Sequence, residues 1–270
     1  MSFGYQVLGF GTVAFPASSF YAATGGTVTT DGDYKVHSFT SSGTFAVTRV
    51  ADDPANAELD YLIIAGGGGS GYPGSSGGGA GGRLYLENYT GITSTGDISV
   101  TVGAGGAGYP DRTSSSLYGD GDSGANSVFN SINAIGGGGG GYRKGVINRS
   151  EGLDGGSGGG SGEARIASSG TAGQGNAGGL HSVGYGPGAG GGAGAAGVGG
   201  TGGVGLASSI TGASVILAGG GAGLSGTAGS GGGGGPGASG TVNTGGGAGG
   251  SDSIVTNGGS GIVIIRYKFR

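Results

Sequence analysis

Alternation of apolar and polar residues outside the glycine-rich stretches predicts β-strands rather than helices. Residues 34–39 and 44–50 alternate in this way, and the polar segment 40–43 between them predicts a hairpin turn. No segment of the chain shows the period of an amphipathic helix. The pattern therefore predicts an all-β fold class with little or no α-helix.

Later strands are expected where apolar runs interrupt the glycines. They are predicted at residues 59–65, 83–89, 97–102, 128–135, 215–218 and 261–267. The four consecutive aliphatics from Ile262 to Ile265 predict a strand that is buried on both faces. The similarly apolar residues 62–65 are its expected partner, which would join the end of this region to its start.

Glycine changes this picture, because the chain has 81 glycines in 270 residues, whereas ordinary chains carry about 7%. Two series follow a strict period of three: Gly188, Gly191, Gly194, Gly197, Gly200 and Gly203, and then Gly220, Gly223, Gly226, Gly229, Gly232 and Gly235. A polyproline-II helix has about three residues per turn. The period therefore predicts polyproline-II or polyglycine-II helices with a bare backbone stripe along one face.

Such helices make no internal hydrogen bonds, and buried backbone groups must be paired. Where the facing residue is glycine, neighbouring helices can approach closely enough to bond through their backbones. Collagen needs an unbroken register and abundant proline, whereas this register breaks and only 6 prolines occur. Disorder is the alternative that composition favours, but apolar strands punctuate the glycines and residues 166–251 lack the charges of a solvated linker. A layered sandwich of glycine-rich helices, clipped by short apolar strands, is the prediction.

Charge and composition restrict the partners. The formal net charge is −4 and no basic cluster suits a phosphate backbone, so no nucleic-acid binding is expected. The longest apolar run, Ile262 to Ile265, is too short to span a membrane. Cysteine is absent and the start of the chain lacks a secretory signal. A soluble protein, made in a cytoplasm without standard export or membrane insertion, is expected.

Catalytic motifs are weak. His37 and His181 are the only histidines, and neither has an obvious carboxylate partner in sequence. His37 is expected to be an exposed strand residue, and His181 to lie at a loop tip. Residues 119–124 place oxygen ligands at alternate positions but lack the later glutamate of a calcium loop, so a plain turn is expected. Residues 77–82 lack the Lys-Ser/Thr of a phosphate loop. We therefore expect no enzyme activity, no cofactor and no metal site.

Binding residues are expected in three loops where larger side chains return between the glycine runs. Aromatic and arginine side chains combine apolar faces with directional donors, which suits glycan or protein surfaces. The candidates are Tyr109, Arg112 and Tyr118 in the first loop, Tyr142, Arg143, Lys144 and Arg149 in the second, and His181 and Tyr185 in the third. The alternative is that these loops are only solubilising connectors.

An ordered series of motifs runs through HSFTSSGTFAV (37–47), YLIIAGGGG (61–69), ISVTVGAGG (98–106), IGGGGGG (135–141), NTGGGAGG (243–250) and GGSGIVIIRY (258–267). This series resembles the glycine-rich domain found in phage tail and virion proteins. The resemblance covers residues 34–267. A more distant similarity, of architecture only, is to the receptor-recognising adhesin at the tip of long tail fibres in T-even-type phages.

The start of the chain, FGYQVLGFG at residues 3–11, looks like the N-termini of marine phage structural proteins. Composition separates residues 1–56, which have ordinary composition and β character, from a glycine-rich domain at residues 57–270. The resemblance implies that the first segment attaches the protein to the particle. The candidates for attachment to other virion proteins are Phe3, Tyr5, Val7, Leu8 and Phe10.

The resemblance implies a virion protein on the particle surface. Its leading role is an adhesin at a tail fibre or tail tip, whose loops bind a host glycan or outer-membrane protein. The alternative is a capsid decoration, whisker or fibre subunit that contacts only virion proteins, and a minor alternative is an ice-binding bundle. A homotrimer is left open, because fibres are commonly trimeric but the chain has no heptad stretch.

Overall fold

β-Strands and hydrogen-bonded irregular segments make up nearly all of the part of the protein that the structure describes. The computed structural model describes residues 19–73, 76–109, 118–144, 148–163, 166–181 and 186–270. The helical content of this described part is one three-residue 3₁₀ turn, η1 (Pro54–Asn56). The expectation of an all-β protein with little or no α-helix is confirmed.

The C-terminal strand is the centre of a five-stranded antiparallel sheet, which we call the β14 sheet. Its order is β2 (Thr27–Asp31), β3 (Tyr34–Phe39), β14 (Ile262–Lys268), β5 (Leu59–Ile64) and β6 (Arg83–Tyr89). Ile264 pairs with Leu62 on one side and with Ser38 on the other. The predicted pairing of the last apolar run with residues 62–65 is therefore confirmed, and β14 also joins strands from both predicted segments of the chain.

A second five-stranded antiparallel sheet, the β4 sheet, packs against the first. Its order is β1 (Ala22–Thr24), β4 (Gly43–Arg49), β7 (Gly96–Thr101), β8 (Ser127–Phe129) and β9 (Ile132–Ala134). One cluster of buried side chains lies between the two sheets. Phe45 and Phe129 come from the β4 sheet and meet Tyr267 and Tyr61 of the β14 sheet, with ring centroids 6.3 and 6.1 Å apart respectively.

Two local predictions are wrong. Residues 40–43 do not close a hairpin, because β3 and β4 belong to different sheets and this segment crosses between them. The predicted strand at 128–135 is instead the hairpin of β8 and β9. Asn130 and Ser131 turn the chain there with φ of 46° and 65°, the left-handed conformations that a tight two-residue hairpin requires.

His37 is also placed differently from the prediction: its side chain is fully buried rather than exposed. Nδ1 lies 2.8 Å from the carbonyl oxygen of Gly25, and Nε2 lies 3.1 Å from the hydroxyl of Tyr267. That hydroxyl accepts the N–H of Ala23 at 3.0 Å. Alternation alone placed His37 on a strand, but only the packing of the second sheet buries its face.

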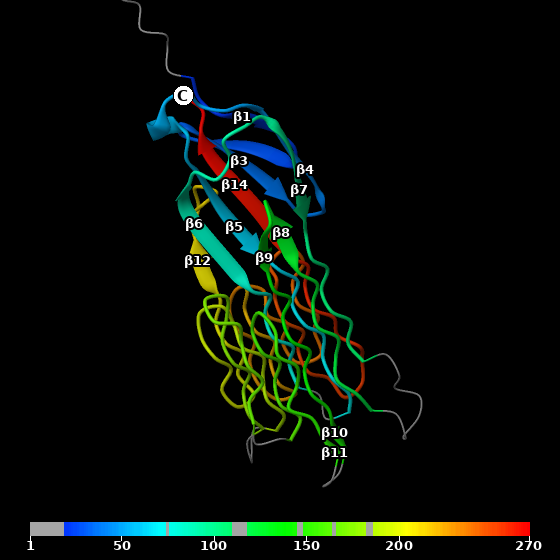
Figure 1. Ribbon diagram of the computed structural model, residues 1–270. Coiled ribbons are helices and arrows are strands. Elements are labelled where there is room, and N and C mark those ends of the chain that lie inside the picture. The colour runs from blue at the N-terminus through cyan, green and yellow to red at the C-terminus, as the bar shows by residue number, and fades with distance from the viewer. Residues whose placement is uncertain (1–18, 74–75, 110–117, 145–147, 164–165, 182–185) are drawn as a thin grey trace, which may run out of the picture.

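The remaining strands form two short hairpins. β12 (Leu206–Ser208) and β13 (Val215–Leu217) pair with each other, and their apolar residues share a second buried cluster with the outer face of the β14 sheet. β10 (Arg143–Lys144) pairs with β11 (Asn148–Arg149). In Figure 1 the two large sheets lie together at one end, and β10 and β11 lie at the opposite end, beyond the glycine segments.

The glycine segments between these ends are joined by backbone hydrogen bonds that repeat every third residue. Segment 77–82 shows the pattern most fully, with N–H to O distances of 2.8–3.0 Å. The N–H groups of Gly77 and Ala80 donate to Gly188 and Gly191, those of Gly78 and Gly81 to Ala248 and Gly245, and those of Gly79 and Gly82 to Gly138 and Ile135. One segment therefore donates to three neighbours that are distant in sequence.

The close approach of these segments requires glycine. A Cβ atom added at Gly68 would lie 2.1 Å from the carbonyl oxygen of Gly138. One added at Gly247 would lie 1.9 Å from the carbonyl oxygen of Gly78. The obstructing atoms are backbone, which cannot rotate away as a side chain can. This half of the molecule therefore has a core of paired backbone groups in place of interlocking side chains.

Candidate functional site

The end of the molecule that carries β10 and β11 holds most of the predicted binding residues that the structure describes. Arg112 and Tyr185 lie outside the described residues, as do Phe3, Tyr5, Val7, Leu8 and Phe10 of the predicted attachment segment. Lys144 and Arg149 are placed by the backbone of β10 and β11. The predictions for Tyr109, Tyr118, Tyr142, Arg143 and His181 can be compared with full side-chain positions.

The structure brings together tyrosines from the first and second predicted loops. The rings of Tyr118 and Tyr142 have centroids 5.0 Å apart and planes 36° from parallel. An antiparallel bridge between Tyr72 and Gly119 positions the segment that carries Tyr118. The N–H of Arg143 donates to the carbonyl of Pro73 at 2.7 Å, and this bond positions the segment that carries Tyr142. Both loops are thus held by the segment that ends the first glycine run.

Tyr109 lies in the same region, where its ring packs against a glycine. A Cβ atom added at Gly119 would lie 2.4 Å from Cε2 of Tyr109, so this ring lies directly against the backbone at Gly119. The N–H of Tyr109 also donates to the carbonyl of Ser70 at 3.0 Å. We call Tyr109, Tyr118 and Tyr142 the distal tyrosine cluster.

A buried carboxylate lies beside the distal tyrosine cluster. Burial raises the pKa of Asp120, while hydrogen bonds from the Ser150 hydroxyl and the Tyr142 backbone oppose the shift. Burial also raises the pKa of Tyr142, and the charges of Asp120 and Tyr118 add to that shift. Among the residues that the structure describes, Oδ1 of Asp120 has no hydrogen-bond partner. This oxygen is itself buried, so it is not open to a ligand in this arrangement.

Arg143 and His181 are held by different partners. Nε of Arg143 is 3.4 Å from Oε1 of Glu163, and 46% of the arginine side chain is exposed, so its remaining N–H groups are accessible to solvent. The N–H of His181 donates to Oγ of Ser161 at 2.7 Å. The tyrosine contacts therefore bring the first two predicted loops together, whereas His181 of the third is held by Ser161.

Sequence reasoning missed Tyr72, Asp120 and Glu163. Tyr72 and Pro73 interrupt two glycine runs, which was a usable signal because larger side chains return there. Asp120 was assigned to a plain turn between glycines. Only the bridge between Tyr72 and Gly119 places it among aromatic rings.

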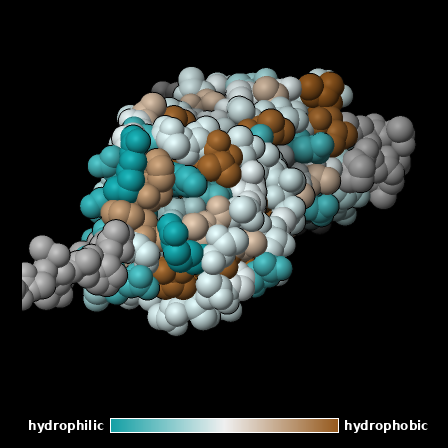
Figure 2. All heavy atoms as spheres, turned by 90° about the horizontal axis from the view of Figure 1, so that it is seen from above, coloured by the Kyte–Doolittle hydropathy of each residue, from teal (hydrophilic) through white to brown (hydrophobic). Residues whose placement is uncertain are grey.

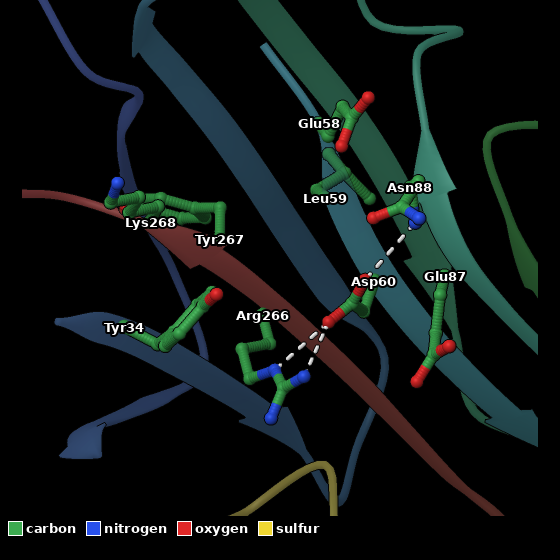
Figure 3. Close-up of a pocket in the computed structure, with 9 residues that line it drawn as sticks. All are labelled: Tyr34, Glu58, Leu59, Asp60, Glu87, Asn88, Arg266, Tyr267 and Lys268. Carbon is green, nitrogen blue, oxygen red and sulfur yellow. Dashed lines mark hydrogen bonds and ion pairs between the residues drawn. The ribbon is translucent and has the colours of Figure 1, made fainter. Parts of the chain in front are cut away.

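A second candidate is a polar pocket of about 290 Å³ on the β14 sheet. Asp60 lies at its centre between Arg266 and Asn88 (Figure 3). Nε and Nη2 of Arg266 donate to Oδ2 of Asp60 at 2.9 and 2.7 Å, and the N–H of Asn88 donates to Oδ1 at 3.1 Å. The guanidinium also lies over the ring of Tyr34, 4.8 Å from its centroid.

These contacts give the polar pocket a structural role. The ion pair of Asp60 and Arg266 joins β5 to β14 across the sheet. Asn88 has φ of 57° where the pairing of β5 and β6 shifts register. Beside the pocket, burial is the main cause that raises the pKa of Tyr85 to about 12, followed by its hydrogen bond to Glu87. None of the described lining residues is Ser, Cys or His, so the lining lacks the usual pair of a nucleophile and a histidine base.

Among the described residues, no group of three or more His, Cys, Asp or Glu side chains could hold a metal ion. In the same part of the chain, no helix has the length and apolar character needed to cross a bilayer. Seen from the strand end, Figure 2 shows brown apolar side chains in small separate groups, surrounded by white residues of intermediate hydropathy and by teal polar residues. This view therefore gives no sign of one broad apolar docking face.

Together, two packed antiparallel sheets and a backbone-bonded glycine region define a β protein of the glycine-rich class. Residues 40–268 match the family model described as a glycine-rich domain, and the chain belongs to this family. The match confirms a glycine-rich domain over most of residues 34–267, where the motifs indicated one. No protein with a curated description is significantly similar in sequence.

Proposed function

We propose that the glycine segments are polyglycine-II helices, stacked as a layered scaffold that the apolar strands clip at one end. The support is the period of three in the hydrogen bonds of segment 77–82. A helix with three residues per turn directs every third N–H to the same side. Its neighbours then receive bonds from successive turns, which is the observed arrangement.

We propose further that the protein is a phage virion component, with host adhesion at a tail fibre or tail tip as its role. The observation that carries this proposal is the convergence of Tyr109, Tyr118 and Tyr142. Tyr142 directly precedes β10, which lies at the end of the molecule opposite the two sheets (Figure 1). Binding residues commonly lie on loops that a rigid scaffold positions. The phage assignment rests on the motif resemblance, whereas the adhesive role rests on this arrangement.

The chemistry of the distal end suits a host saccharide or an outer-membrane protein loop. Tyrosine rings offer apolar faces with a hydroxyl at the edge, and Arg143 offers exposed N–H donors. A ligand with both hydroxyl groups and apolar patches would use both kinds of contact.

The opposite end is proposed to face the particle. In this arrangement the N-terminal residues bind other virion proteins, and the two sheets hold the scaffold away from the attachment point. The attachment candidates Phe3 and Tyr5 lie outside the described residues, so this part of the proposal depends on the resemblance of the N-terminal motif.

The test is adsorption of the phage particle to its host. The double variant Tyr118→Ala, Tyr142→Ala removes the paired rings and should reduce adsorption at least about tenfold, since aromatic anchors commonly dominate binding energy. Tyr34→Ala removes a tyrosine that is 38% exposed on the β14 sheet and should leave adsorption unchanged. Normal adsorption by assembled particles carrying the double variant would refute the adhesive role and leave a purely structural subunit as the function.

A further inference from the structure

A second cavity lies between the β12–β13 hairpin and the outer face of the β14 sheet. The hairpin is held over this face at both sides. Nη2 of Arg83 on β6 donates to the carbonyl of Ala207 at 3.3 Å. At the other side, a Cβ atom added at Gly212 would lie 2.7 Å from Cγ of Asp31 on β2. The hairpin therefore spans the sheet from one edge strand to the other and leaves a space of about 260 Å³ beneath it.

The interior of this cavity is aliphatic. Leu62 and Ile264 supply the wall from the sheet, and Ile210 and Leu217 supply the wall from the hairpin. All four side chains are at most 7% exposed, so they are held in place by the second buried cluster of the molecule. Two independent elements thus form a preformed apolar concavity.

The polar groups of the cavity are neutral. Thr211 and Thr244 are among the lining residues, together with Ser38, Ser208 and Asn243, and none of the described lining residues carries a charge. An apolar interior with a few neutral hydrogen-bonding groups is typical of a small-molecule site. An ionised ligand would lose hydration there without meeting an opposite charge.

We propose that this cavity binds a small neutral molecule with an apolar body and one hydrogen-bonding end, of the size of a substituted benzene ring. An apolar cavity of about 150 Å³ is known to hold benzene, so the present cavity has room for a ring with one or two substituents. A second protein chain is a poorer occupant, since a stable interface needs about 800 Å² from each partner. This site is separate from the distal tyrosine cluster and does not depend on the proposed adhesive function.

The experiment uses the full chain and 4-methylphenol as the probe, with methyl NMR shifts of leucine, isoleucine and valine as the readout. Saturable shifts of Leu62, Leu217 and Ile264 are expected. The anion 4-methylbenzoate, which has the same ring and methyl group, should bind at least about tenfold more weakly because of its charge. Absence of saturable shifts with 4-methylphenol would overturn the proposal, and equal binding of the anion would overturn its neutral-ligand chemistry.

A pair of adjacent residues supplies the matched variants. Val215 and Ile216 are both on β13 and both 45% exposed, but only Val215 is among the residues that line the cavity. Neighbouring residues on a strand point to opposite faces. Val215→Trp should fill the mouth and weaken 4-methylphenol binding at least about tenfold, whereas Ile216→Trp should leave it unchanged. Equal binding by both variants would show that the probe binds elsewhere on the protein.

Discussion

The two halves of this molecule are built from opposite materials. At the strand end, the sheets enclose large side chains such as Phe45, Phe129 and Tyr267, each at most 1% exposed. At the glycine end, neighbouring segments are bonded through N–H and C=O groups with no side chain between them. One half depends on hydrophobic burial, and the other on backbone pairs worth about 0.5–1.5 kcal/mol each. The comparison implies opposite sensitivities. At the strand end, stability should fall when a side chain is made smaller. At the glycine end, stability should fall when any atom is added.

The largest effect is expected where a methyl group is added to the backbone core. Gly68→Ala would place Cβ 2.1 Å from the carbonyl oxygen of Gly138, and relieving this clash must break hydrogen bonds in several segments. We expect a loss of at least about 4 kcal/mol in the free energy of unfolding, or no folded protein. Urea unfolding followed by circular dichroism measures it.

Gly235→Ala is the matched control for that substitution, since a Cβ atom added at Gly235 meets no atom within 4 Å. Its effect should lie within about 0.5 kcal/mol of wild type. If both glycine variants were equally stable, the glycine end would not have a core of tightly packed backbone.

The second largest effect is expected from removing side-chain volume in the core of the strand end. Phe45 is 1% exposed and contacts the rings of His37 and Phe129, so Phe45→Ala should cost about 3–5 kcal/mol. Val28→Ala, at a residue that is 45% exposed, should cost far less. Equal losses in thermal unfolding experiments would contradict a side-chain core between the sheets.

A smaller, pH-dependent effect is expected from His37. Burial is the main cause that lowers its pKa below the ordinary value, the charge of Lys35 adds to the shift, and the hydrogen bond to Gly25 opposes it. The folded state therefore favours the neutral imidazole. Its contribution to stability is fully present above the unfolded pKa of about 6.5 and is lost as the pH falls toward the lower folded pKa.

The measurement is the urea midpoint at pH 7.5 and at pH 5. The midpoint should fall at the lower pH in wild type, and His37→Gln should reduce this dependence. His181→Gln, at a histidine that is only partly buried, should retain the wild-type dependence. If His181→Gln removed the dependence and His37→Gln kept it, the buried histidine would not be its source.

Much of the strand arrangement could be predicted from the chain. The run from Ile262 to Ile265 and its pairing with β5 followed from consecutive aliphatics, because only a strand covered on both faces buries all of them. β2 was missed, since its sequence TVTTD is largely exposed and carries little apolar signal. The segment 40–43 was misassigned because a hairpin turn and a crossing between two sheets use the same polar residues.

The candidate site was predicted by residue type but not by arrangement. Tyr118 and Tyr142 were chosen because large side chains are scarce among the glycines. Their contact at 5.0 Å depends on which glycine segments are neighbours. Asp120 was not chosen at all, because its burial between loops that are distant in sequence has no local signature.

The sequence by itself determined that glycine would leave bare backbone every third residue, and that apolar runs would become strands. Both follow from local chemistry: glycine lacks Cβ, and consecutive aliphatic residues must be covered. Only the tertiary structure decided which glycine segment pairs with which other glycine segment. The N–H of Gly78 donates to Ala248 rather than to any of the other glycine runs. Backbone groups are alike in every run, so that selection comes from the strands and loops that hold the segments in register.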